Sequence, residues 1–118
     1  MKQIAIIDGG YRSYEFEKKL FASHGYELSI GTGQENSDSH PFELNRTAHG
    51  ILVRDTPVGP AELDQMPQLK AIVRYGVGYD NIDLEAAKQR GIRVANVQGY
   101  ANHSVSDHAL ALMFACTR

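Results

Sequence analysis

The sequence predicts an α/β fold in which a doubly wound parallel sheet of five strands carries helices on both faces. Short apolar runs alternate with stretches of helical periodicity along the chain, which is typical of a parallel sheet. The first run, residues 4–7, is apolar on both faces, as a central parallel strand requires. Five such runs favour the flavodoxin-like strand order 2-1-3-4-5.

Each expected element has a signal in the sequence. Strands are expected at residues 4–7, 27–30, 51–53, 69–75 and 93–97. The helical stretches lie at residues 14–24, 42–48, 60–66, 83–90 and from 104 onward. Gly25 and Gly91 are expected to end two of these helices, and the polar residues 31–41 predict a surface loop.

Three side chains are expected to cap helices. Ser13 is the expected N-cap of the first helix, with Phe16 and Leu20 on one face. Asp83 is the expected N-cap of the fourth helix. Ser104 begins an S-x-x-D pattern that predicts the start of the last helix. The rest of that helix, HALALMFAC, is apolar almost all round, which predicts that a partner surface covers it.

Composition bounds the class of protein without indicating its chemistry. A chain of 118 residues is long enough for one domain with a core of its own. The formal net charge of -2 gives no sign of a nucleic-acid partner, and no segment is long enough to span a membrane. Since the single Cys116 cannot form an internal disulfide, a cytoplasmic location is expected.

The ends of the predicted strands bring two arginines and a glycine-rich turn to one edge of the sheet. Arg54 follows the third strand, and Arg74, Gly76 and Gly78 follow the fourth. Ligands of open parallel sheets bind at this edge. Guanidinium groups suit an acid, and glycines let a turn present its N–H groups. The alternative is that the arginines are merely solvated and the glycines form an ordinary turn.

Other kinds of site find little support. The third glycine of a dinucleotide-binding G-x-G-x-x-G would fall at position 81, which is Asn81, so this turn does not predict a cofactor site. The histidines and Cys116 show no zinc-type spacing, and no metal site is expected. No Ser-His-Asp arrangement is evident.

The second half of the chain carries the most specific pattern. Residues 74–87 read RYGVGYDNIDLEAA, residues 90–97 read RGIRVANV, and residues 105–112 read VSDHALAL. This sequence closely resembles the D-isomer-specific 2-hydroxyacid dehydrogenase family, including its phosphoglycerate dehydrogenase and C-terminal-binding-protein branches. Gln98 and Ser106 depart from the family, which commonly has Pro and Ala there. The first half of the chain matches only in its alternation of strands and helices.

The resemblance implies a substrate-binding lobe at residues 1–100 and a helix at residues 101–118 that leads to an NAD-binding Rossmann domain. In the family, N–H groups of the G-V-G turn hold the carboxylate of a small 2-hydroxy or 2-keto acid. Carried onto this chain, the expected substrate-binding residues are Arg54, Arg74, Gly76, Val77 and Gly78. Val105 is expected to approach the nicotinamide end of NAD.

The family's catalytic arginine, acid and histidine lie beyond the matched part. We therefore expect this chain to be truncated before the NAD-binding domain, to hold no catalytic residue and to be inactive alone. The apolar last helix predicts a homodimer. Two alternatives stay open at this point: an NAD-sensing, corepressor-like scaffold of the same fold, and a free-standing module that binds small anions.

Overall fold

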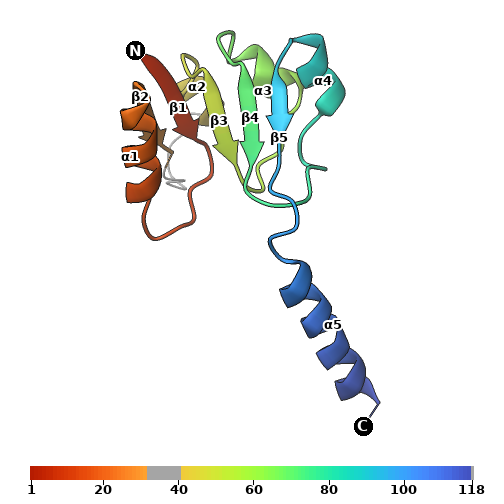
Figure 1. The fold of residues 1–118 in the computed structure, drawn as a ribbon. Coiled ribbons are helices and arrows are strands. Elements are labelled where there is room, and N and C mark those ends of the chain that lie inside the picture. Colours follow the sequence, from red (N-terminus) through yellow and green to blue (C-terminus); the bar gives the residue numbers. More distant parts are fainter. Residues whose placement is uncertain (32–40, 118) are drawn as a thin grey trace.

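The structure, a computed structural model, describes residues 1–31 and 41–117 and confirms the predicted architecture. One parallel sheet has the strand order β2-β1-β3-β4-β5 (Figure 1). Its strands are β1 (Lys2–Ile6), β2 (Tyr26–Ile30), β3 (Gly50–Val53), β4 (Ala71–Arg74) and β5 (Arg93–Ala95). The helices are α1 (Glu15–Ser23), α2 (Pro41–Leu44), α3 (Pro60–Asp64), α4 (Leu84–Gln89) and α5 (Asn102–Cys116). Most of the expected loop at 31–41, residues 32–40, lies outside the described residues.

All five strands run in one direction, so their carboxyl ends share one edge of the sheet. We call this edge, formed by residues 7–10, 54–56, 75–78 and 96–97, the carboxyl edge. In Figure 1 the arrowheads point to it, and α5 leaves the lobe from the same side. The strand order places the end of β3 between the ends of β1 and β4.

The sheet has apolar side chains on both faces, and different helices cover them. One face packs against α2, α3 and α4 in a core that includes Phe42, Leu63 and Ala87. The other face packs against α1 through Tyr14 and Phe21. All four residues of β3 are buried, as the continuous apolar run predicts for a central strand. The expectation of helices on both faces is confirmed.

The face of α1 that packs on the sheet is not the face that carries Phe16 and Leu20. Phe16 is 75% exposed and Leu20 is 45% exposed, so neither side chain faces the sheet. The inward stripe is instead formed by Tyr14, Glu17 and Phe21, which are buried or half-buried and share one side of the helix at intervals of three and four residues. Tyr14 fixes this orientation because its hydroxyl accepts the N–H groups of Gly10 and Tyr11, at 2.8 and 3.1 Å.

Two of the three predicted caps are wrong. The Ser13 hydroxyl accepts the Glu15 N–H at 3.3 Å, but the N-cap residue of α1 is Tyr14. The last helix begins at Asn102, so Ser104 lies inside its first turn and caps nothing. Asp83 is confirmed as the N-cap of α4, because its carboxylate accepts the Ala86 N–H at 2.9 Å.

Helix α5 extends away from the lobe (Figure 1) and buries none of its residues. The molecule is therefore 57 Å long but only 32 and 31 Å across. Its radius of gyration of 16.8 Å exceeds the value of about 13.5 Å expected for a compact domain of this length. No helix of the described residues is long and apolar enough to cross a bilayer.

Candidate functional site

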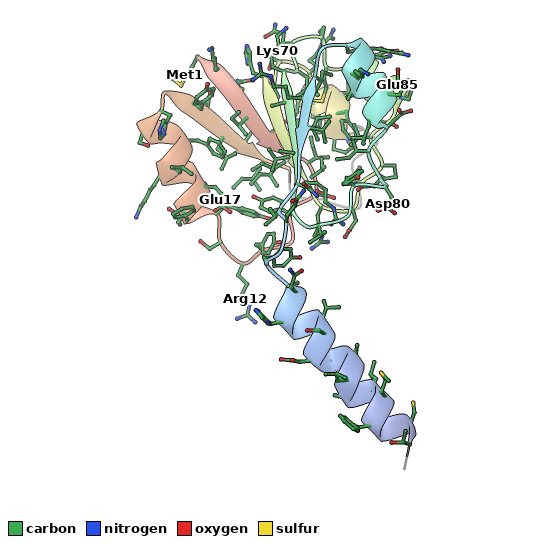
Figure 2. All side chains as sticks on the ribbon, turned by 45° about the vertical axis from the view of Figure 1, so that its right-hand side comes forward. Met1, Arg12, Glu17, Lys70, Asp80 and Glu85 are labelled. Carbon is green, nitrogen blue, oxygen red and sulfur yellow. The ribbon has the colours of Figure 1, made fainter. Side chains whose placement is uncertain are left out.

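The carboxyl edge brings together residues that are far apart in the sequence. The backbone N–H of Arg54, after β3, donates to Asp8 after β1 at 2.6 Å. The guanidinium of Arg74, at the end of β4, donates to the Arg54 carbonyl at 2.8 Å. Asn96, after β5, donates to the Val77 carbonyl at 2.6 Å. The turn after β4, at residues 76–78, lies at this edge. In Figure 2 Asp80, which follows the turn, lies at the opposite edge of the sheet from Lys70, which precedes β4.

Asp8 holds the loop after β3 in place. Its Oδ1 accepts the Arg54 N–H, and its Oδ2 accepts the N–H groups of Asp55 and Thr56 at 2.7 and 2.8 Å. The Thr56 hydroxyl adds a fourth bond at 2.9 Å. Burial raises the pKa of the Asp8 carboxyl, but these hydrogen bonds outweigh it and lower the pKa below its ordinary value. The ionised carboxylate therefore fixes where Arg54 leaves the sheet.

The two arginines share one acidic partner, Asp55. Arg54 Nε donates to Asp55 Oδ2 at 3.0 Å, and an Arg74 terminal nitrogen donates to Oδ1 at 3.3 Å. The Arg74 side chain is 19% exposed and also holds the Arg54 carbonyl, so it mainly supports the loop. The Arg54 side chain is 42% exposed, and within residues 1–31 and 41–117 its terminal nitrogens have no hydrogen-bond partner. Of the two, Arg54 is the better placed to meet a ligand.

Each guanidinium lies over a glycine. A Cβ at Gly10 would collide with the Arg54 guanidinium, and a Cβ at Gly76 would collide with that of Arg74. Gly76 also has a φ of 150°, a backbone conformation that other residues rarely adopt. These two glycines therefore give the arginines room at the edge, and the second also shapes the turn, as the sequence predicts.

The turn after β4 presents two N–H groups. The Gly76 N–H donates to the Arg74 carbonyl at 2.9 Å and is not available to a ligand. The Val77 and Gly78 N–H groups have no protein acceptor among the described residues. Val77 is 45% exposed and Gly78 is exposed. Successive backbone N–H groups that lack a protein acceptor are available to an anion.

Two hollows lie near the turn. A hollow of about 190 Å³ is lined by Tyr11, Tyr75, Gly76, Val97 and Tyr100. A second, of about 150 Å³, is lined by Tyr79, Leu84, Val94, Ala95 and Asn96. A larger one of about 420 Å³ is lined by residues of α2, α3 and the segments after them and includes no part of the carboxyl edge. None of these hollows is lined by Val77 or Gly78.

The sequence did not point to the tyrosines near the turn. Tyr11 packs against Tyr14 and Tyr75, with ring centroids 6.1 and 5.3 Å apart. The Tyr75 hydroxyl lies 3.4 Å from the Glu17 carboxylate, to which it donates. Burial, followed by the Glu17 charge, raises the pKa of the Tyr75 phenol above its ordinary value, so it stays protonated. Their only signal was position: Tyr75 directly precedes Gly76, and Tyr11 follows the end of β1.

The other predicted roles concern residues away from this turn. Val105 lies on α5 and is 65% exposed. Asn81, at the position of the missing third glycine, donates to the Thr56 carbonyl at 2.9 Å and so braces the loop after β3. The residues present at this turn therefore do not fit a dinucleotide. Within the described part of the chain, no group of three histidine, cysteine or acidic side chains is placed to bind a metal ion.

Comparison with known proteins gives concordant matches. Residues 5–118 match the model of a family described as D-isomer specific 2-hydroxyacid dehydrogenase, catalytic domain. D-3-phosphoglycerate dehydrogenase from Archaeoglobus fulgidus is 41% identical over 99 residues, covering 80% of this chain and 18% of that protein. Hydroxypyruvate reductase from Thermotoga maritima is 50% identical over 69 residues, covering 58% of this chain and 22% of that protein.

A solved structure extends the match to most of the fold. NAD+-bound 3-phosphoglycerate dehydrogenase from Entamoeba histolytica has 26% sequence identity and a TM-score of 0.76. The similarity covers 95% of this chain but 38% of that one. This chain thus spans about a fifth of the length of the two curated relatives and under half of the solved one.

Proposed function

Because the chain belongs to the D-isomer specific 2-hydroxyacid dehydrogenase family, we propose that its carboxyl edge binds the carboxylate of a small 2-hydroxy or 2-keto acid. The observation that carries this proposal is the pair of free N–H groups at Val77 and Gly78. A carboxylate has two oxygens that can accept from two backbone donors, and donors to a charged acceptor form the stronger class of hydrogen bond.

Arg54 supplies positive charge at the same edge of the sheet as this pair of donors. Asp8 fixes the backbone of Arg54, and Asp55 holds Nε, which leaves the terminal nitrogens free among the described residues. Arg74 contributes charge from a less exposed position and keeps Arg54 in place through its carbonyl. Gly76 allows the turn its shape. We therefore retain all five predicted residues as substrate-binding residues, Arg54, Arg74, Gly76, Val77 and Gly78, with Arg74 and Gly76 acting through their neighbours.

For the whole protein we propose an NAD-dependent oxidoreductase acting on 2-hydroxy acids. Bound NAD would supply the exchange of hydride with the C2 carbon of the substrate. The turn at residues 76–81 does not fit the dinucleotide, so we assign NAD binding chiefly to residues outside this chain. Val105 on α5 is the one residue here that we propose to approach the cofactor. We assign no catalytic residue to this chain.

The 118-residue chain is expected to bind small 2-keto acids without converting them. Titration with glyoxylate, pyruvate or hydroxypyruvate, followed by calorimetry or ligand NMR, should give dissociation constants in the millimolar range, because half a site lacks the groups that clamp the ligand. Pyruvamide is the matched control, since it replaces the carboxylate by a neutral amide. Equal binding of pyruvamide, or no binding of any of the acids, would refute the proposed site.

We also propose that the chain self-associates through α5. Leu110, Leu112, Met113 and Phe114 are each more than half exposed, and an apolar surface of this kind promotes association. Light scattering should show a dimer or larger species, and replacing Leu112 and Phe114 by glutamate should return a monomer. A clean monomer of the unaltered chain at high concentration would contradict this.

A cytoplasmic location accords with the free, exposed Cys116.

A further inference from the structure

We propose that Asn96 is a positioning residue that aims the Gly78 N–H at the substrate carboxylate. The proposal rests on the proposed function, because it assigns a role within the same site. Asn96 directly follows β5, and its side-chain amide donates to the Val77 carbonyl at 2.6 Å. Nothing in the pattern of the sequence pointed to this contact.

The turn is held from one side through its carbonyl groups. The Val97 N–H donates to the Gly76 carbonyl at 2.9 Å, and the Asn96 side chain donates to the Val77 carbonyl. In a trans peptide the C=O and the following N–H point in opposite directions. Fixing the Gly76 and Val77 carbonyls toward the end of β5 therefore turns the Val77 and Gly78 N–H groups away from β5, on the same side as each other.

The two hydrogen bonds that hold the turn have different donors: one is a backbone N–H and the other is a side-chain amide. The bond that orients the Val77 N–H comes from backbone and would survive any side-chain change at Val97. The bond that orients the Gly78 N–H comes from the Asn96 side chain alone among the described residues. Since the peptide between Val77 and Gly78 ends on a glycine, little else restricts its rotation. Loss of the Asn96 amide should therefore release the Gly78 donor and leave the Val77 donor in place.

If Asn96 only stabilised the fold, its removal would lower thermal stability. The Asn96 bond lies at the exposed end of a three-residue strand, where water can replace the lost donor. Its removal should therefore hardly change thermal stability. The effect should instead be on the direction of one backbone donor, and so on the affinity for an anion.

The test compares Asn96→Ala with Gln98→Ala in the 118-residue chain. Gln98 is the matched control, because it is an exposed amide two residues away whose side chain makes no hydrogen bond among the described residues. In the absence of ligand, the carbonyl ¹³C resonance of Val77 should move in Asn96→Ala and stay in place in Gln98→Ala. Pyruvate should then bind Asn96→Ala about tenfold more weakly, the lower end of the loss expected for one hydrogen bond to a charged acceptor.

The outcomes separate this proposal from the function on which it rests. If the unaltered chain binds pyruvate and Asn96→Ala binds it equally well, the positioning role is wrong and the proposed function stands. If no chain binds a 2-keto acid, the proposed function fails, and the positioning role fails with it even if the Val77 resonance moves. A fall in melting temperature large enough to explain the weaker binding by unfolding of Asn96→Ala would make Asn96 a structural residue. That result would overturn the proposal.

Discussion

Asp8→Asn should destabilise the chain by about 3 kcal/mol at neutral pH, because the substitution removes a charge that accepts four hydrogen bonds. An asparagine of the same shape can keep an oxygen toward Thr56, but it must then face the Arg54 N–H with its own NH₂ group. The Arg54 N–H is then left without an acceptor. Chemical denaturation at pH 7 would measure the loss as a lower midpoint with an unchanged slope.

The effect of Asp8→Asn should depend on pH in one direction. The pKa of Asp8 is lowered in the folded chain, so its contribution is fully present above the unfolded pKa of about 3.9. It is lost as the pH falls through the lower, folded pKa. The stability difference between the two chains should therefore shrink below about pH 4. Asp64→Asn, which removes an exposed ion pair with Arg90, is the control and should cost under about 1 kcal/mol. A difference that stayed constant down to pH 2 would exclude the ionised Asp8 as the cause.

Gly31→Ala should destabilise the chain by about 2–3 kcal/mol, because the added methyl group would meet backbone atoms. A Cβ at Gly31 would lie 2.7 Å from the Ile6 carbonyl oxygen and 2.9 Å from that of Ile7. Both are backbone atoms of the strand β1 or its end, so no side-chain rotation relieves the overlap. The Gly31 N–H also donates to the Ile6 carbonyl at 2.7 Å, a bond that any shift would stretch.

Thermal unfolding checks the Gly31 prediction, with Gly59→Ala as its control. Gly59 has extended backbone, with a φ of -115°, and a Cβ there would meet only the flexible end of the Glu62 side chain, at 3.2 Å. Gly59→Ala should therefore change stability by less than about 0.5 kcal/mol. Equal effects of the two substitutions would mean that β2 yields to the methyl group and that the close approach to β1 carries no strain.

The fold could be predicted because its signals are local. Short runs rich in apolar residues mark the strands, and Asp83 with Gly91 marks the ends of α4. The orientation of α1 could not be predicted in this way. Its inward stripe is fixed by Tyr14, whose hydroxyl accepts two loop N–H groups, and by Glu17, which accepts from Tyr75. Counting apolar residues favours Phe16 and Leu20 because it ignores such polar anchors.

The start of α5 shows a second limit of local patterns. The S-x-x-D pattern at Ser104 fits the interior of a helix as well as its beginning. Gly99, with a φ of 75°, turns the chain earlier, and the helix begins at Asn102. The glycine-rich turn was visible in the sequence, and so were the arginines beside it. What fixes the direction of its N–H groups was not visible, because the bond from Asn96 to Val77 joins side chain to backbone across 19 residues.

The backbone ¹H–¹⁵N spectrum of the chain during titration with pyruvate tests the central claim most directly. The account predicts that the amide protons of Val77 and Gly78 move downfield together, along one saturable curve, while the amide of Gly76 responds far less because it is already bonded to Arg74. Pyruvamide should leave all three in place. If Val77 and Gly78 stay fixed while the acid binds elsewhere on the chain, the turn is not the carboxylate site.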